Sequence, residues 1–95
     1  MALLKEIELE NGVIVKYHRI VSINKITNNQ TIVEVASYTN EEKREEEKEA
    51  IKNGTSMNVF IDTNYYNFDY NENDNIQDYY NKLKELDKFK DAEDI

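Results

Sequence analysis

The stretch "VASYTNEEKREEEKEAIKNG", from Val35 to Gly54, decides whether this chain forms one structural unit or two. A strand-like run ends at Tyr38, and a block of charged residues follows it. A flexible linker between two domains would be rich in glycine, serine or proline. Residues 41–52 are instead good helix formers. The stretch therefore predicts a helix that belongs to a single fold.

The ends of this helix are marked by the sequence. Thr39 or Asn40 can cap its start, and Asn53-Gly54 is a stop signal at its end. A helix of about three turns is marginal in water, so it must dock on the rest of the protein. We expect a crossover helix over about 40–52 along the edge or one end of a sheet. Ala50 and Ile51 are its expected anchors, on a face formed by Lys43, Arg44, Glu47, Ala50 and Ile51.

Before this stretch, the sequence reads as antiparallel strands over about 3–10, 13–26 and 30–38, joined first by the hairpin signal Asn11-Gly12. A two-residue loop would place glutamates on the valine face. A three-residue loop pairs Leu9 with Val13 and keeps one apolar face, because strand side chains alternate. We therefore expect a type I turn with a bulge, with Gly12 at positive φ. A second bulge or bend is expected near 19–20.

After the charged helix, the alternation of side chains predicts strands over about 56–63 and 65–70, with a break at Asn64. A last helix is expected over about 74–90, capped by Asp74 or a neighbouring asparagine. Its apolar residues recur at helical spacing and draw one stripe: Ile76, Tyr79, Tyr80, Leu83, Leu86 and Phe89. The predicted fold is a single α+β domain over 1–95. It is an antiparallel sheet of about four to five strands, with a short charged crossover helix and a C-terminal amphipathic helix packed on the sheet.

Charge and composition exclude several classes of function. The 95 residues carry a net charge of −8 and include no cysteine. The first forty residues are neutral, and most of the acidic surplus lies in residues 41–52 and 69–95, the segments that contain the two predicted helices. Sequence-independent binding to nucleic acid or to anionic lipid needs the opposite sign. We expect neither partner, and we expect no signal peptide and no transmembrane segment.

Catalytic and metal chemistry have no recognisable pattern here. His18 is the single histidine, and its strand position predicts a surface residue rather than a general base. The segment from Asp69 to Tyr80 matches the first, third and fifth positions of a calcium loop. It lacks the glycine and the bidentate glutamate that such a loop needs. We therefore expect a loop that caps the last helix, with no catalytic residue, no cofactor and no metal site.

The stretch "NYYNFDYN" is the candidate partner-binding surface, through Tyr65, Tyr66, Phe68 and Tyr70. Aromatic rings supply contact area at low entropic cost, and amides supply adaptable hydrogen bonds. A protein partner or a glycan could bind there. The alternative is that one face of this strand packs under the final helix and the other is ordinary surface.

Three segments resemble a known group of proteins: "IVEVASYTNEEKREEE" (Ile32–Glu47), "LLKEIELENGVIVKYHRIVSI" (Leu3–Ile23) and "YYNKLKELDKFKDAEDI" (Tyr79–Ile95). They are similar to small tail- and baseplate-associated structural proteins of phages or prophages of Gram-positive bacteria. The run "KREEEKEAIK" is more charged than that group's pattern. The resemblance implies a small α+β protein of the virion that acts by assembly, and it transfers no catalytic residue.

The sequence thus predicts a non-enzymatic virion or tail-associated structural or adaptor protein, with other virion proteins or a homo-oligomer as its partner. The resemblance alone implies that the protein is made in the cytoplasm of the bacterial host and is located in the virion. Two alternatives stay open. One is an acidic inhibitor that mimics nucleic acid and blocks a host DNA-binding protein, and the other is a small glycan-recognition module. An exposed edge in the long second strand could also pair with another chain.

Overall fold

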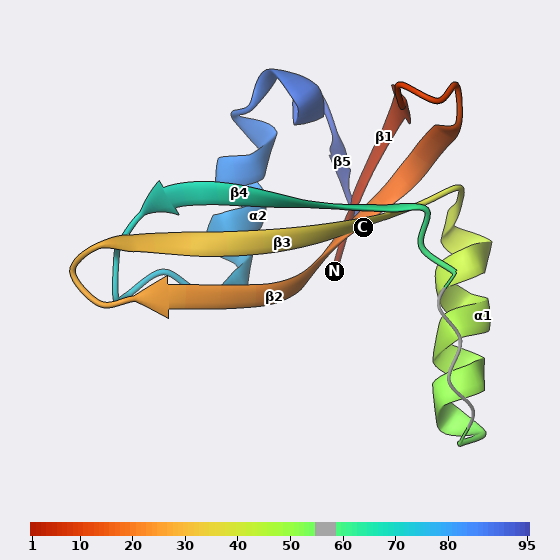
Figure 1. Cartoon of the computed structure of the whole chain (residues 1–95), viewed down its shortest axis with the longest axis horizontal. Coiled ribbons are helices and arrows are strands. Elements are labelled where there is room, and N and C mark those ends of the chain that lie inside the picture. Colours follow the sequence, from red (N-terminus) through yellow and green to blue (C-terminus); the bar gives the residue numbers. More distant parts are fainter. Residues whose placement is uncertain (55–58) are drawn as a thin grey trace.

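The protein folds as an α+β structure built on one antiparallel sheet, as the sequence predicts. The structure is a computed structural model that describes residues 1–54 and 59–95. Within these residues the sheet has five strands in the order β4-β3-β2-β1-β5 (Figure 1). The elements in chain order are β1 (Leu3–Glu8), β2 (Ile14–Ile26), β3 (Gln30–Tyr38), α1 (Glu41–Lys52), β4 (Asp62–Asp69), α2 (Ile76–Lys84), the 3₁₀ turn η1 (Asp87–Phe89) and β5 (Glu93–Asp94).

The first hairpin confirms the three-residue loop. Ile7 lies opposite Val15. The Leu9 amide donates to the Val13 carbonyl at 2.8 Å. Gly12 has a φ of +84°, the left-handed region that glycine enters without steric cost. Next to the turn, the two strands therefore have the register that the alternation of apolar residues requires, and the register shifts by one residue between Leu4 and Ile7.

α2 covers one face of the sheet, and a second, smaller cluster of buried residues lies on the other face, at the end near α1: Ala2, Tyr17, Ala36 and Tyr38. In Figure 1, α2 lies behind β2, β3 and β4, and α1 stands at one end of the sheet. The predicted stripe of α2 supplies much of the core, because Tyr79, Tyr80 and Leu83 are buried, while Ile76 at its start is 55% exposed. The main core cluster of buried residues comprises Leu3, Val33, Val35, Tyr79, Tyr80, Leu83 and Phe89. The face turned to the viewer carries no helix over β4 and β3 among the described residues.

The region before α2 corrects the expected strand pattern. The sequence predicts strands over 56–63 and 65–70 separated at Asn64, but the structure has a single strand, β4. Asn64 is paired with Val35 inside it, because an unbroken ladder with β3 overrides asparagine's weak strand preference. Residues 59–61 precede the strand, and 56–58 lie outside the described residues.

The last helix is shorter than predicted. The sequence predicts a helix over 74–90, but α2 ends at Lys84 and Leu86 has an extended backbone with ψ of 144°. The break returns Phe89 to the sheet, where its ring lies 5.2 Å from the His18 ring. The chain then reverses at Asp91, whose φ is +67°, and β5 pairs with β1. Tertiary packing of Phe89 therefore decides where the helix ends.

Candidate functional site

The attachment of α1 is polar. Glu47 is the buried residue of this helix. Its Oε1 accepts a hydrogen bond from the Tyr38 hydroxyl at 2.9 Å and another from the Arg44 guanidinium. The expectation that Ile51 anchors the helix is wrong, because Ile51 is 62% exposed. α1 therefore contacts the end of the sheet through the carboxylate of Glu47, which accepts the hydrogen bond of the Tyr38 hydroxyl.

Tyr38 keeps its proton in this contact. Burial raises the pKa of its hydroxyl, the hydrogen bond to Glu47 raises it further, and Arg19 acts in the opposite direction. A protonated hydroxyl donates and a carboxylate accepts, so the pair is matched. We interpret the Tyr38–Glu47–Arg44 contact as a structural clasp.

His18 is a core residue, and the expectation of a surface position is wrong. It is fully buried, because pairing with Leu3 and Ser37 places it on the face that Phe89 covers. Its Nε2 lies 2.8 Å from the Lys5 carbonyl, which can only accept, so Nε2 carries the proton. Nδ1, at 2.7 Å, then accepts from the Ser37 hydroxyl.

The chemistry available to this histidine is limited by these contacts. Burial lowers the pKa of His18, the Lys5 carbonyl opposes that effect, and the Lys88 cation lowers it further. Both ring nitrogens are occupied inside the protein. The ring is therefore suited to holding β1, β2 and β3 together, and an external substrate has no route to it through the described structure.

The acidic loop before α2 caps the helix. Asn71 Oδ1 accepts from the Asn73 amide at 3.0 Å, and Asn75 and Asp78 form a reciprocal capping box at the start of α2. Asp74 Oδ2 lies 3.1 Å from Lys82 Nζ. Within the described residues, no group of three or more His, Cys, Asp or Glu side chains is placed to hold a metal.

The four aromatic residues predicted to form a binding surface are divided between the two faces of the sheet. Tyr65 is 67% exposed on the open face. Tyr66 and Phe68 face the core, where Tyr66 meets the Phe89 ring at 5.8 Å and Phe68 lies 6.4 Å from the Tyr79 ring. Tyr70, just after the strand, is half-buried. Of the four candidate residues, Tyr65 alone is exposed.

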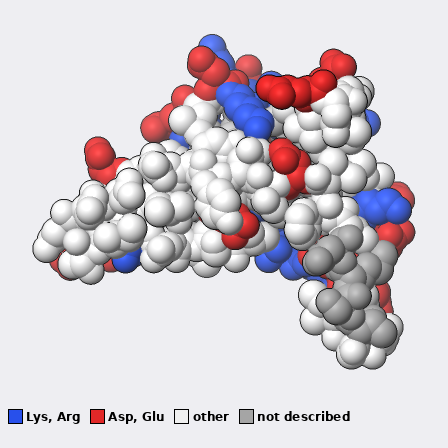
Figure 2. Space-filling view, viewed as in Figure 1, with Lys and Arg blue, Asp and Glu red and all other residues white. Residues whose placement is uncertain are grey.

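The strand that carries these residues has one edge that no other described strand pairs with. β4 is the terminal strand of the sheet and pairs with β3 from Asp62 to Asp69. Its only charged residues are the two aspartates at its ends, and it contains no proline. Figure 2 shows that the face in front of β4, β3 and β2 is mostly free of charged atoms, although the chain carries −8 overall.

A second free edge lies on β2. The ladder between β1 and β2 ends where Leu3 meets His18, whereas β2 continues to Ile26. Beyond that point the Ile20 amide donates to the Tyr80 hydroxyl at 2.9 Å. After a bulge at Val21, β2 pairs with β3 from Ser22 to Ile26 on one side, and no described strand lies on the other.

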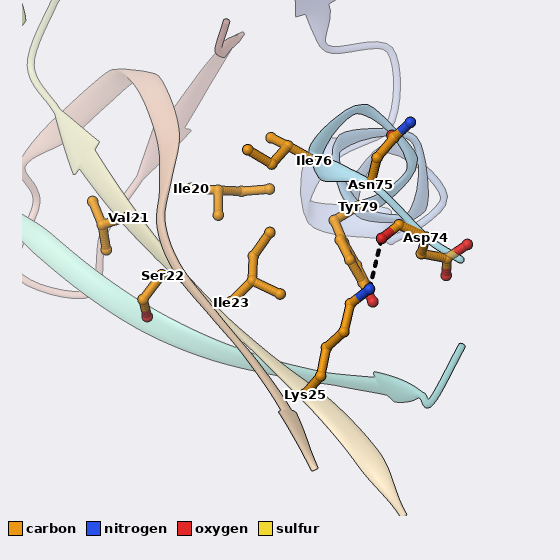
Figure 3. Close-up of a pocket in the computed structure, with 9 residues that line it drawn as sticks. All are labelled: Ile20, Val21, Ser22, Ile23, Lys25, Asp74, Asn75, Ile76 and Tyr79. Atoms are coloured by element: carbon orange, nitrogen blue, oxygen red, sulfur yellow. Dashed lines mark hydrogen bonds between the residues drawn. The ribbon is translucent and has the colours of Figure 1, made fainter. Parts of the chain in front are cut away.

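A groove of about 490 Å³ runs beside this second edge (Figure 3). Ile20 and Ile23 point from β2 toward α2, while Val21 and Ser22 lie on the other side of the strand. Lys25 closes one end, since its Nζ donates to the Asp74 carbonyl at 2.7 Å. The groove is lined by Ile20, Val21, Ser22, Ile23, Lys25, Asp74, Asn75, Ile76 and Tyr79.

Comparisons with protein-family models, with curated proteins and with solved structures gave no match. No helix in the described part of the chain is both long and apolar enough to cross a membrane.

Proposed function

We propose that this chain is a non-enzymatic assembly module that pairs with a second copy of itself through the free edge of β4. One observation carries the proposal: an eight-residue terminal strand without lysine, arginine or proline. Soluble proteins usually protect such an edge with those residues, with a short strand or with a covering element. The opposite terminal strand, β5, is protected, because it has two residues and both are acidic.

The side chains of β4 are compatible with pairing to an identical strand. Facing residues of an antiparallel ladder point to the same face of the sheet. Asp62 lies on the face of Tyr66, and Asp69 lies on the face of Tyr65, so Asp62 of one copy never faces Asp69 of the other. A pairing centred on Tyr65 or Tyr66 brings aromatic and amide side chains together without carboxylate repulsion. A two-fold axis of this kind is the commonest symmetry of homo-oligomers.

Sedimentation equilibrium over a range of protein concentrations tests the proposal. The wild type is expected to dimerise. The double variant Tyr65→Lys/Asn67→Lys is expected to weaken dimerisation by about tenfold or more, because two lysines on each edge repel. Asn24→Lys adds a cation to an exposed position of β2, away from the β4 edge, and is the matched control. A wild type that stays monomeric, or a double variant that dimerises normally, would refute the proposal.

The place where this assembly acts is a separate proposal. The resemblance to tail and baseplate proteins supports a role in a virion. Mass spectrometry of purified particles tests it, and absence of the chain from all particles would leave the assembly module without that role.

A further inference from the structure

We propose that the groove beside β2 binds an extended segment of a partner protein. The segment adds to the sheet as a strand beside Val21–Lys25, places alternate apolar side chains in the groove, and carries acidic residues at its end. This inference goes beyond the proposed self-assembly, because it uses β2 and α2 rather than the edge of β4.

The backbone of β2 sets the length of the segment. Tyr80 marks one end of the free edge: its hydroxyl accepts from the Ile20 amide and donates to the Met1 carbonyl at 3.0 Å. It thereby bridges β1 and β2 where they separate. Lys25 marks the other end through its bond to Asp74. Five strand residues at about 3.3 Å each leave room for about five residues of an added strand.

The groove supplies apolar contacts on the same side. Ile76 departs from the pattern of α2, since it belongs to the apolar stripe and yet is 55% exposed. It faces Ile20 across the groove in Figure 3. Every second side chain of an added strand would point into this space, since strand side chains alternate. An extended segment with valine, isoleucine or leucine at alternate positions fits this lining.

The charge beside the groove determines which kind of residue is favoured at the end of the segment. A neighbouring recess of about 260 Å³ shares Ile20 and Ile76 with the groove and is also lined by Arg19, Arg44 and Lys48. None of the described residues that line this recess is acidic. Figure 2 shows a group of basic atoms between the sheet and α1. On a chain of charge −8, such a basic recess favours an acidic group.

The direction of the segment follows from the sheet. The recess lies at the Arg19 end of the free edge. A segment that continues the line of β1 runs antiparallel to β2, so its C-terminal end reaches that recess. Antiparallel pairs outnumber parallel pairs in protein sheets. The acidic residues are therefore expected after the apolar ones.

The first test is an NMR titration with a synthetic peptide whose ends are blocked. In it, valine alternates with threonine over about five residues, and two aspartates follow. The expected result is a saturable shift of the amide signals of β2 and of the first turn of α2. Replacing the aspartates with lysines, or moving them to the N-terminal end, is expected to weaken binding. Two further peptides are N-methylated, one at the odd and one at the even amides of the apolar stretch. Only the peptide whose methylated amides face β2 is expected to lose binding.

Two matched pairs of variants locate the peptide. Ile76→Ser is expected to weaken binding by about tenfold, whereas Ile51→Ser, at a similarly exposed position of α1, leaves it unchanged. Lys48→Glu is expected to weaken binding more than Lys43→Glu. Both lysines pair with a glutamate three residues away on α1, and only Lys48 lines the recess.

Three outcomes would overturn the inference. They are no saturable shift at millimolar peptide, equal loss of peptide binding by the two variants of each pair, or unchanged binding of both N-methylated peptides. The titration is repeated on the Tyr65→Lys/Asn67→Lys variant. Binding that persists there supports the groove even where self-assembly fails. A peptide that shifts β4 amides instead counts against it.

Discussion

The two helices of this protein are attached in opposite ways. α2 has nine residues, and three of them are buried apolar or aromatic side chains. α1 has twelve residues, and its buried residue is a glutamate. The longer helix is therefore the one with less apolar surface in contact with the sheet. α1 is helical because its residues are good helix formers, whereas α2 is held on the sheet by its buried side chains.

This difference predicts that the helices open independently. Apolar burial is the main source of folding free energy, and hydrogen bonds add a smaller net amount. Segments with few buried apolar contacts open locally at lower free energy than the core. We expect the amides of α1 to exchange with solvent before those of α2, and the substitutions below strengthen or remove that contrast.

The largest effect is expected for Leu83→Ala, at a fully buried position of α2. Removing the side chain leaves a cavity between the helix and the sheet, so the free energy of unfolding should fall by about 2–5 kcal/mol. Urea unfolding followed by circular dichroism measures it. A loss below about 1 kcal/mol would show that α2 is not the main cover of the sheet.

Glu47→Ala is expected to cost about 1–3 kcal/mol, because it leaves the buried Tyr38 hydroxyl without its acceptor. The loss should appear mainly in α1, as faster amide exchange there than in β3. Glu46→Ala is the matched control, since its ion pair with Lys43 is exposed and worth little. Equal exchange rates in the two variants would contradict the polar clasp.

The elements that carry a periodic pattern of apolar residues could be predicted from the sequence. The stripe of α2 and the parity of the first hairpin each depend on spacing within one segment. Glu47 could not be identified as the contact of α1. Helical spacing places Glu47 on the expected docking face, but it cannot show that Glu47 rather than Ile51 makes the buried contact, because that contact depends on where the chain turn brings Tyr38. His18 was misplaced for a related reason, since its burial depends on Phe89, far along the chain.

The candidate site was predictable to a smaller extent. Alternation separates Tyr65 from Tyr66 and Phe68, so a division between two faces could be inferred from the sequence. An exposed edge on the long β2 could also be inferred. The position of β4 at the end of the sheet and the groove beside Ile76 depend on strand order and on the placement of α2. Neither is encoded in the spacing of residues within a segment.

A smaller effect is expected for the pH dependence of stability, through His18 on the side of the sheet that α2 covers. The pKa of His18 is lowered by burial beneath Phe89 from its ordinary value of 6.5. A depressed pKa in the folded state means that the stabilising contribution is fully present above about pH 6.5. That contribution is lost as the pH falls from there through the lowered pKa. The free energy of unfolding should therefore decrease over that range.

Two measurements check this dependence. The chain has one histidine, so the NMR signal of its ring protons reports the pKa directly. A midpoint at or above 6.5 would contradict the prediction. In His18→Gln the pH dependence of urea unfolding between about pH 7 and 5 should be weaker than in the wild type. An unchanged slope would assign the dependence to carboxylates instead.

The smallest effect is expected where the sequence predicts an anchor. Ile51→Ala changes a residue of α1 that is 62% exposed, so little apolar contact is lost. Alanine is also the stronger helix former, and the free energy of unfolding should change by less than about 0.5 kcal/mol in either direction. A loss of about 2 kcal/mol, close to that of Leu83→Ala, would mean that α1 docks through its apolar residues after all. The two helices would then be held by the same force, and Glu47→Ala would be expected to have the lesser effect of the two on α1.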